Sequence, residues 1–251
     1  MVGKLVKNVF DVILPPIQRC QLCGHHKASD EYGLCTVCRK ELDYWDDKYH
    51  ECSLCGRFIA QEGLCGRCRK NKPLFAAARS VGPYRGILKD CLNNLKFRGS
   101  RGLAVPLGKL LAHKLRSAIK VSEIAFIAPV PMHPDKEEVR GFNQAVLLAR
   151  EVGRELGIPV LEGLLCKNRD TVAQIHLSSK ERTENLTGSF TVAPGEEHLS
   201  EGKVILLVDD IMTTGSTVKE CSRELLDAGA QKVIVGTVAT GIHFSPTNNP
   251  H

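Results

Sequence analysis

Eight of the eleven cysteines in this 251-residue chain fall into four Cys-x-x-Cys pairs, all within the first 70 residues. A Cys-x-x-Cys turn directs two thiolates at one ion, and two such turns complete a tetrahedral site with no open position. A site of this kind is structural rather than catalytic. So short a segment buries little apolar surface, and metal binding would therefore supply folding free energy. The expected ligands of two structural zinc ions are Cys20, Cys23, Cys35, Cys38, Cys52, Cys55, Cys65 and Cys68.

The paired cysteines also repeat as a unit. Cys-Gln-Leu-Cys-Gly (20–24) recurs as Cys-Ser-Leu-Cys-Gly (52–56), and Leu-Cys-Thr-Val-Cys-Arg-Lys (34–40) recurs as Leu-Cys-Gly-Arg-Cys-Arg-Lys (64–70). We expect each repeat to bind its own ion; the alternative is a crossed arrangement, in which the first pairs of both repeats share one ion. Redox-active dithiols are a further interpretation, but four pairs in duplicated order favour zinc. The other thiols are expected to be buried or incidental: Cys91, Cys166 and Cys221.

The N-terminus carries no convincing export signal. Residues Met1–Ile17 include suitable lysines, but Asp11 interrupts the apolar run and no small-residue cleavage site follows. The apolar positions instead predict a short amphipathic helix that ends at Pro15-Pro16. No stretch reaches the roughly 18 consecutive apolar residues of a membrane span. We therefore expect a cytoplasmic protein, where cysteines bind metal rather than form disulfides.

The chain changes character near Pro73, where apolar segments of strand and helix type begin to alternate. Such alternation predicts an α/β fold with a mainly parallel sheet covered by helices on both faces. The expected organisation is a double zinc-ribbon module in 1–72, an α/β domain in 73–242 and a disordered tail in 243–251. The predicted helices are Leu103–Ile119, Phe142–Leu156 and Ser216–Ala228, with a loop over Gln174–Thr187. The predicted strands are Ala125–Val130, Ile158–Leu165, Gly188–Ala193, Val204–Val208 and Val233–Val238.

One run near the C-terminus predicts a phosphate site. Residues Val204–Thr217 read Val-Ile-Leu-Leu-Val-Asp-Asp-Ile-Met-Thr-Thr-Gly-Ser-Thr. The apolar start predicts a buried strand that ends at the carboxyl edge of the sheet, where such folds bind ligands. The backbone amides at the following helix start, together with hydroxyls and a glycine, suit a dianionic phosphate. The predicted loop consists of Thr213, Thr214, Gly215, Ser216 and Thr217.

An acidic pair, Asp209 and Asp210, stands between that strand and the loop. Carboxylates repel phosphate but accept hydrogen bonds from sugar hydroxyls, so a ribose 5-phosphate matches both features, and we expect 5-phosphoribosyl-1-pyrophosphate. The loop is not of the Walker type, because no Gly-Lys-Ser/Thr closes it. The alternative is a strand and a capped helix in which Asp, Ser and Thr serve capping alone. The length of the run favours the ligand site.

The run Val204–Thr217 resembles the ribose-phosphate loop of type I phosphoribosyltransferases. Nearly the whole chain resembles one branch of them, the ComF (competence protein F-like) family. One stretch departs from that family, because Lys136, Glu137 and Glu138 stand where further arginines are typical. Besides the cysteine turns, the resemblance rests on Lys96–Gly99, Pro129–Pro134, Arg140–Gln144 and Gln174–Asn185.

The resemblance implies roles for several of these segments. The turn with Pro131, Met132 and His133 would face pyrophosphate, and the loop Gln174–Asn185 would close over it. Magnesium would bridge the pyrophosphate and the ribose hydroxyls. The cationic side chains expected near pyrophosphate are Lys96, Arg98, Lys180 and Arg182; for Lys96 and Arg98, a solvated basic turn or contact with a nucleic-acid backbone are the alternatives.

The resemblance also implies a cytoplasmic factor in natural transformation that handles single-stranded DNA. The net charge of +6 fits anionic partners without specifying one. An active phosphoribosyltransferase is the alternative, with Asp209 and Asp210 stabilising an oxocarbenium-like state; no segment indicates which nucleophile would attack. A sensor that binds the sugar phosphate without turnover is the third possibility. The sequence contains no indication of the oligomeric state.

Overall fold

The computed structural model describes residues 18–168 and 188–242. The helix expected over Met1–Ile17, the loop expected over Gln174–Thr187 and the tail 243–251 lie outside the described residues. Within the described ranges, none of the helices is both long and apolar enough to cross a bilayer.

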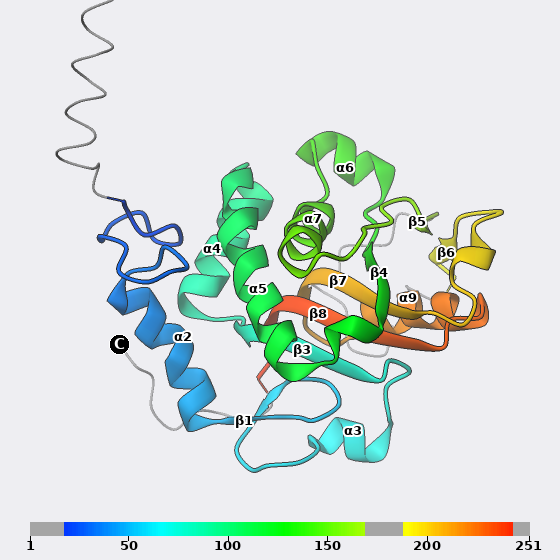
Figure 1. Ribbon diagram of the computed structural model, residues 1–251, viewed down its shortest axis with the longest axis horizontal. Coiled ribbons are helices and arrows are strands. Elements are labelled where there is room, and N and C mark those ends of the chain that lie inside the picture. The colour runs from blue at the N-terminus through cyan, green and yellow to red at the C-terminus, as the bar shows by residue number, and fades with distance from the viewer. Residues whose placement is uncertain (1–17, 169–187, 243–251) are drawn as a thin grey trace, which may run out of the picture.

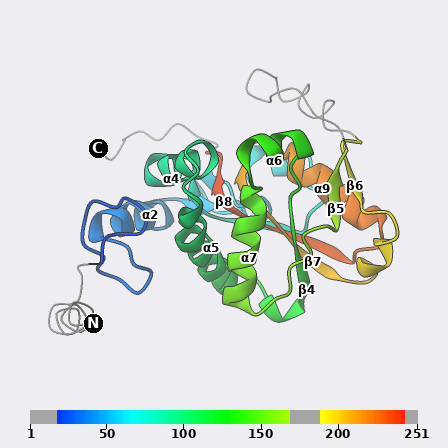
Figure 2. The same cartoon turned by 90° about the horizontal axis from the view of Figure 1, so that it is seen from above.

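Four parallel strands form the central sheet. Their order is β3 (Ala77–Pro83), β8 (Lys232–Thr240), β7 (Val204–Met212) and β4 (Ile124–Pro129). Helices α5 (Ala104–Ala118) and α7 (Gln144–Leu156) cover one face, and α9 (Ser216–Asp227) covers the other (Figures 1 and 2). The expected α/β architecture is therefore confirmed.

Strand alternation explains the two layers of core. Successive side chains of a strand point to opposite faces, so a strand buried on both faces is apolar throughout. In β7, Leu206 and Val208 pack into the cluster that contains α5 and α7. Ile205 and Leu207 pack into the second cluster, which contains the apolar side of α9. The apolar run at 204–208 thus belongs to a central strand.

Two strand predictions are corrected by the structure. The strand expected to end at Val208 continues to Met212, because β8 runs alongside and pairs Asp209 with Thr237 and Met212 with Thr240. The strand expected over Ile158–Leu165 is wrong: only Val160 makes a bridge, to Ile127, and the regular strand begins at Leu165. Pro159 lacks an amide hydrogen, which removes one donor from any ladder there.

The remaining elements flank this sheet. The other predicted helices and strands are found within a few residues of their expected ends, whereas β3 and the helix after it had no clear pattern in the sequence. A small antiparallel pair, β5 with β6, lies beside α9 (Figure 1). The elements not yet given are α2 (Thr36–Lys48), β1 (His50–Glu51), β2 (Phe58–Ile59), α3 (Gly66–Lys70), α4 (Gly86–Phe97), α6 (Pro134–Arg140), β5 (Leu165–Lys167), β6 (Phe190–Val192) and the 3-10 turns Arg101–Leu103, Val121–Glu123 and Glu197–Leu199.

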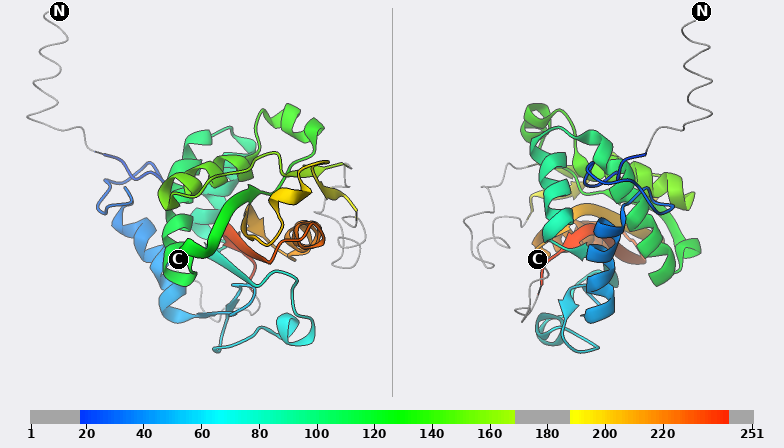
Figure 3. Two further views of the ribbon diagram at one scale, coloured as in Figure 1. Left: turned by 45° about the vertical axis from the view of Figure 1, so that its right-hand side comes forward. Right: turned by 90° about the vertical axis from the view of Figure 1, so that its left-hand side faces the viewer.

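The two cysteine repeats pack on opposite sides of the sheet. We call residues 18–48 the first ribbon and residues 49–72 the second ribbon. Cys20, Cys35 and Cys38 join the core cluster of α4 and α5, beside Leu88 and Leu92. The cysteines of the second ribbon join the cluster of α9, beside Phe75 and Val218. Figure 3 shows the first ribbon, in blue, beside α4 and α5, and the second, in cyan, below the sheet.

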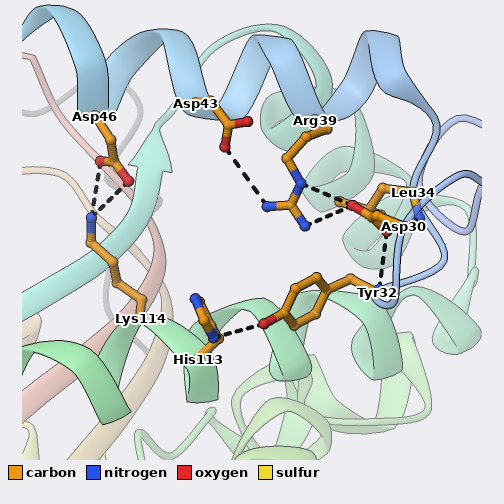
Figure 4. A network of polar contacts seen from close by, with 8 residues as sticks. All are labelled: Asp30, Tyr32, Leu34, Arg39, Asp43, Asp46, His113 and Lys114. Carbon is orange, nitrogen blue, oxygen red and sulfur yellow. Dashed lines mark hydrogen bonds and ion pairs between the residues drawn. The ribbon is translucent and has the colours of Figure 1, made fainter.

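Polar contacts hold the first ribbon and α2 against α5 (Figure 4). Arg39 pairs with Asp30 at 2.7 Å and also faces Asp43. The Tyr32 hydroxyl lies 2.7 Å from Nδ1 of His113, on α5. Lys114 of α5 contacts Asp46 of α2 at 2.9 Å. The first ribbon is therefore attached to α5 through Tyr32 and Asp46, whereas the ion pairs of Arg39 lie within the ribbon.

Candidate functional site

The eight cysteines form two groups, and each group comes from a single repeat: Cys20, Cys23, Cys35 and Cys38, then Cys52, Cys55, Cys65 and Cys68. The sulfur atoms within each group lie within 4.8 Å of one another. Tetrahedral zinc with Zn–S bonds of about 2.3 Å requires sulfurs about 3.8 Å apart. The Sγ atoms of Cys23 and Cys35 are 3.8 Å apart, and those of Cys55 and Cys65 are 3.7 Å apart. The grouping within each repeat is confirmed, and the crossed arrangement is excluded.

Backbone amides donate hydrogen bonds to cysteine sulfur atoms in both sites. The Sγ atoms of Cys35 and Cys65 cap α2 and α3, where each accepts a hydrogen bond from the amide three residues on. Burial raises the pKa of Cys20, but backbone hydrogen bonds from Cys23, Cys35 and Leu22 outweigh it and lower the pKa to about 6. The same balance, with hydrogen bonds from Cys55 and Cys65, lowers the pKa of Cys52 to about 7. The thiolate form is thus favoured at Cys20 and Cys52, whereas burial raises the pKa of Cys38, Cys55 and Cys68, which would lose their protons when the ion binds.

The second ribbon is attached to the edge strand of the sheet through its backbone. The amide of Ala78, in β3, donates to the Leu54 carbonyl at 2.7 Å. Gly56 adopts φ +64°, and a Cβ there would lie 2.6 Å from the Ala78 carbonyl oxygen. Only glycine meets both conditions. The close approach sets the position of the following residues, which include Arg57.

A hollow of about 530 Å³ opens at the carboxyl ends of β7 and β4. We call it the sugar-phosphate hollow. Eight of the residues proposed from the sequence line it: Lys96, Pro131, Met132, His133, Asp209, Asp210, Thr213 and Thr217. Sequence positions more than one hundred residues apart therefore meet at one edge of the sheet, where open α/β folds bind ligands.

Asp209 and Asp210 are buried, with 8% and 4% of their surface exposed. Burial, followed by the adjacent Asp210 carboxylate, raises the pKa of Asp209 well above its ordinary value. Its Oδ1 accepts a hydrogen bond from the Asp210 amide at 2.8 Å. Two neighbouring carboxylates in a largely desolvated position are costly unless a cation or hydroxyl donors approach them.

Lys96 provides one such cation. Its Nζ lies 2.5 Å from Oδ2 of Asp210, and the Lys96 side chain is 19% exposed. Lys96 lies in the last turn of α4 and lines the hollow together with Phe97. One lysine for two carboxylates leaves room for a further cation or for hydroxyl groups of a sugar.

Asn143 positions the turn after β4. This buried side chain caps α7 by accepting from the Ala145 amide and donates through Nδ2 to the Val130 carbonyl at 3.0 Å. The Val130 amide donates to the Val208 carbonyl, in the neighbouring strand. The turn is therefore held from both sides, with Pro131, Met132 and His133 lining the hollow. His133 also caps the short helix α6.

The phosphate loop leads from β7 into α9. Gly215 adopts φ +82°, and a Cβ there would meet only ordinary van der Waals contacts, so its backbone conformation is the reason for glycine. The first amides of a helix lack intrahelical acceptors and remain available to an anion. Behind the loop, the Gly241 amide and the Thr240 hydroxyl donate to the Met212 carbonyl. The Arg57 guanidinium donates to the Thr213 carbonyl.

Not every proposed residue reaches the sugar-phosphate hollow. Thr214, Gly215 and Ser216 line a separate hollow on the other side of the loop, against the second ribbon. Arg98 ends α4 and lines a hollow beside the first ribbon. Lys180 and Arg182 lie outside the described residues. Several further residues line the sugar-phosphate hollow that were not among the predicted ligand contacts: Tyr84, Phe97, Lys136, Arg140, Asn143, Gln144 and Lys167.

Comparisons with known families match both halves of this arrangement. Residues 9–69 match the double zinc ribbon domain, and residues 142–244 match the phosphoribosyl transferase domain. Together with the sulfur geometry, the first match assigns two structural zinc sites to the chain. The second places the acidic pair and the phosphate loop within a phosphoribosyltransferase-type domain.

Whole-length relatives are also found. Competence protein F of Haemophilus influenzae is 31% identical over 88% of this chain and 96% of its own length. DNA utilization protein YhgH of Escherichia coli is 31% identical over 86% and 94%, and competence protein ComFC of Bacillus subtilis is 31% identical over 84% and 89%. Among solved structures, a glutamine phosphoribosylpyrophosphate amidotransferase from B. subtilis is 27% identical over 51% of this chain and 24% of that chain, with a TM-score of 0.35.

Proposed function

The chain belongs to the competence protein F family, and on that basis we propose that it binds 5-phosphoribosyl-1-pyrophosphate with magnesium in the sugar-phosphate hollow. The observation that carries the proposal is the convergence there of Asp209, Asp210 and the two ends of the phosphate loop, Thr213 and Thr217. The loop offers amides and hydroxyls to the 5-phosphate, whereas the carboxylates suit the ribose 2- and 3-hydroxyls. Lys96 and the turn at Pro131–His133 line the same hollow, and on this proposal they would contact the pyrophosphate.

Magnesium fits the donors that are present. Hard oxygen ligands suit this ion, which commonly binds one or two carboxylates together with substrate phosphates. Asp209 and Asp210 carry more negative charge than Lys96 alone neutralises. A bound magnesium ion would supply charge neutralisation for the pyrophosphate. The carboxylates would hold the sugar.

The cellular role that we propose is in DNA uptake, as a cytoplasmic factor that handles single-stranded DNA. The names of the relatives, competence protein F and DNA utilization protein, support it. The net positive charge suits a phosphate backbone. DNA-uptake proteins are the partners expected on this proposal.

Calorimetry of 5-phosphoribosyl-1-pyrophosphate with magnesium tests the binding proposal. The wild type is expected to bind, and Asp209→Asn/Asp210→Asn is expected to lose at least about tenfold in affinity, because each lost hydrogen bond to a charged group is worth about 1.5–3 kcal/mol. Glu201→Gln, an exposed carboxyl outside the hollow, is the matched control and should bind as the wild type does. Absence of binding by the wild type would refute the proposal.

Catalytic turnover is a second candidate. The observation in its favour is that cationic side chains, Lys96, Lys136 and Arg140, line the same hollow as the acidic pair, so charge could be stabilised on a departing pyrophosphate. Stoichiometric pyrophosphate release in the presence of an acceptor would establish turnover. Binding without release, across a panel of nucleophiles, would leave the protein a sensor or a DNA-handling module.

A further inference from the structure

A second hollow, of about 350 Å³, lies between the second ribbon and the phosphate loop. We call it the ribbon cleft. Its ribbon wall consists of the chain around Cys55, Cys68 and Pro73, and its other wall is the start of α9. The cationic residues that line it are Arg57, Arg67, Lys70, Lys72 and Lys219, and no carboxylate of residues 18–168 or 188–242 lines it.

Arg57 is the side chain among these that most strongly indicates an anion-binding site. It is only 8% exposed, and it forms no ion pair with any carboxylate among the described residues. Among the described residues, its hydrogen-bond acceptor is the Thr213 carbonyl. Burying a guanidinium beside a hollow costs free energy unless an anion compensates its charge. The cleft therefore suits an anion.

The four other cations are exposed, and none of them forms an ion pair with a described residue. The zinc-bound tetrathiolate of the second ribbon carries two negative charges, which compensate only part of this group. Two of the cations are particular to the second repeat, because Arg57 and Arg67 stand where the first repeat has His25 and Val37, whereas Lys70 corresponds to Lys40. A ribbon that only needed to balance its own zinc site would not require them.

The other wall of the cleft is the phosphate loop itself, because Thr214, Gly215 and Ser216 line the cleft. We propose that the ribbon cleft binds consecutive phosphate groups of a second ligand, separate from the ligand of the sugar-phosphate hollow. The inference draws on the proposed function for that hollow only in treating the two ligands as distinct.

The chemistry of the cleft selects a polyanion without selecting bases. Phe75 is the only aromatic residue in the described part of the chain that lines it, and Phe75 is 4% exposed, so the described lining offers no ring for base stacking. The phosphodiester backbone of a single strand and inorganic polyphosphate present the same repeated phosphates. Recognition would depend on charge and therefore on salt concentration.

The experiment compares the zinc-loaded wild type with Arg67→Gln/Lys70→Gln/Lys72→Gln. Fluorescence anisotropy follows a labelled single-stranded oligonucleotide over a range of salt, and inorganic tripolyphosphate serves as a competitor and as a ligand in calorimetry. The matched control is Lys40→Gln/Lys89→Gln/Lys203→Gln, which removes the same charge from exposed positions outside the cleft. The triple cleft variant should flatten the slope of log affinity against log salt by about 2, because each phosphate contact to a single strand contributes about 0.7.

The outcomes separate the sources. If the cleft variant, unlike the control, loses binding of the oligonucleotide but not of tripolyphosphate, the result supports a strand as ligand. If it loses binding of tripolyphosphate but not of the oligonucleotide, the result supports free polyphosphate. Equal binding by the cleft variant and the control overturns the proposal, and so does a wild type that binds neither probe. Binding of 5-phosphoribosyl-1-pyrophosphate by the cleft variant is measured in parallel and should persist. If the wild type does not bind 5-phosphoribosyl-1-pyrophosphate, the proposed function is refuted, but the proposal for the ribbon cleft is unaffected.

A second variant tests the cleft without changing the zinc ribbon. Lys219→Gln changes the wall that contains no zinc ligand, and it should flatten the salt slope by about 0.7. Zinc content near two ions per chain and an unchanged Tm verify that each variant is folded. An unchanged slope in Lys219→Gln together with an unchanged slope in the triple variant would overturn the proposal.

Discussion

Single side chains in the sugar-phosphate hollow stand in environments that oppose folding. Asp209 is buried beside another carboxylate, and Lys96 reaches Asp210 but leaves Asp209 with a backbone amide. Natural proteins retain such arrangements at functional sites, because the groups that bind the ligand also lower the stability of the fold. Stability and ligand affinity should therefore respond in opposite directions to neutral substitutions at Asp209.

Asp209→Asn should raise the Tm at neutral pH. The pKa of Asp209 is raised in the folded state, so its contribution to stability is present below the ordinary carboxyl pKa and is lost as pH rises through the folded pKa. Asparagine does not ionise and therefore avoids this loss of stability. Each kcal/mol gained in the free energy of unfolding raises the Tm by roughly 2–4 °C. The gain should shrink towards pH 4. Differential scanning calorimetry at both pH values, with exposed Asp90→Asn as control, measures it; an equal Tm decrease at both would contradict the account.

Lys96→Gln should weaken binding of 5-phosphoribosyl-1-pyrophosphate more than binding of ribose 5-phosphate. Only the first ligand carries the pyrophosphate that Lys96 is expected to contact, and a charged hydrogen bond is worth about 1.5–3 kcal/mol, or roughly tenfold and more. Lys89→Gln, on the exposed face of α4, is the matched control. Calorimetry with both ligands gives the ratio. An equal loss for the two ligands would show that Lys96 contributes no contact to pyrophosphate.

At the scale of elements, amphipathic or fully apolar segments were predicted well. Leu107, Leu111 and Leu115 mark one stripe of α5, and the apolar run at 204–208 marks the central strand. The strand β3 escaped prediction because its small and polar residues, such as Ala78 and Ser80, show no periodic pattern. Its burial comes from pairing with β8, a contact between distant parts of the chain.

The packing of α5 against α7 gives a prediction at this scale. A Cβ at Gly108 would lie 2.6 Å from Cβ of Glu151, so the two helices approach closely at that point. Gly108→Ala should lower stability by about 1–3 kcal/mol, the usual cost of overpacking. Gly163→Ala, where a Cβ meets nothing within 4 Å, is the control. Equal midpoints of urea unfolding for both variants would contradict the close contact.

At the scale of the whole molecule, the two zinc ribbons are integrated into the domain rather than appended to it. The first joins the core on the side of α5, and the second joins the core on the side of α9. The cysteine spacing predicted both zinc sites. It did not predict which face each ribbon covers, nor the contact from Arg57 to Thr213, because these depend on the path of the chain in space.

The two zinc sites should differ in their effect on the ligand. Elemental analysis should find two zinc ions in the wild type and one in Cys23→Ser or Cys55→Ser, and both variants should have a lower Tm because zinc binding contributes to folding. Only Cys55→Ser should weaken binding of 5-phosphoribosyl-1-pyrophosphate, by about tenfold or more, since Arg57 supports the phosphate loop. A wild-type zinc content near one, or an equal loss of affinity in the two variants, would contradict this view.

The central claim is that the acidic pair and the phosphate loop hold one sugar-phosphate ligand. The most direct test is a crystal structure of the zinc-loaded protein with 5-phosphoribosyl-1-pyrophosphate and magnesium. It should show the 5-phosphate within hydrogen-bond distance of the amides in Thr213–Thr217 and the ribose hydroxyls on Asp209 and Asp210. A ligand bound away from the acidic pair, with Asp209 and Asp210 contacting only the protein, would contradict the claim.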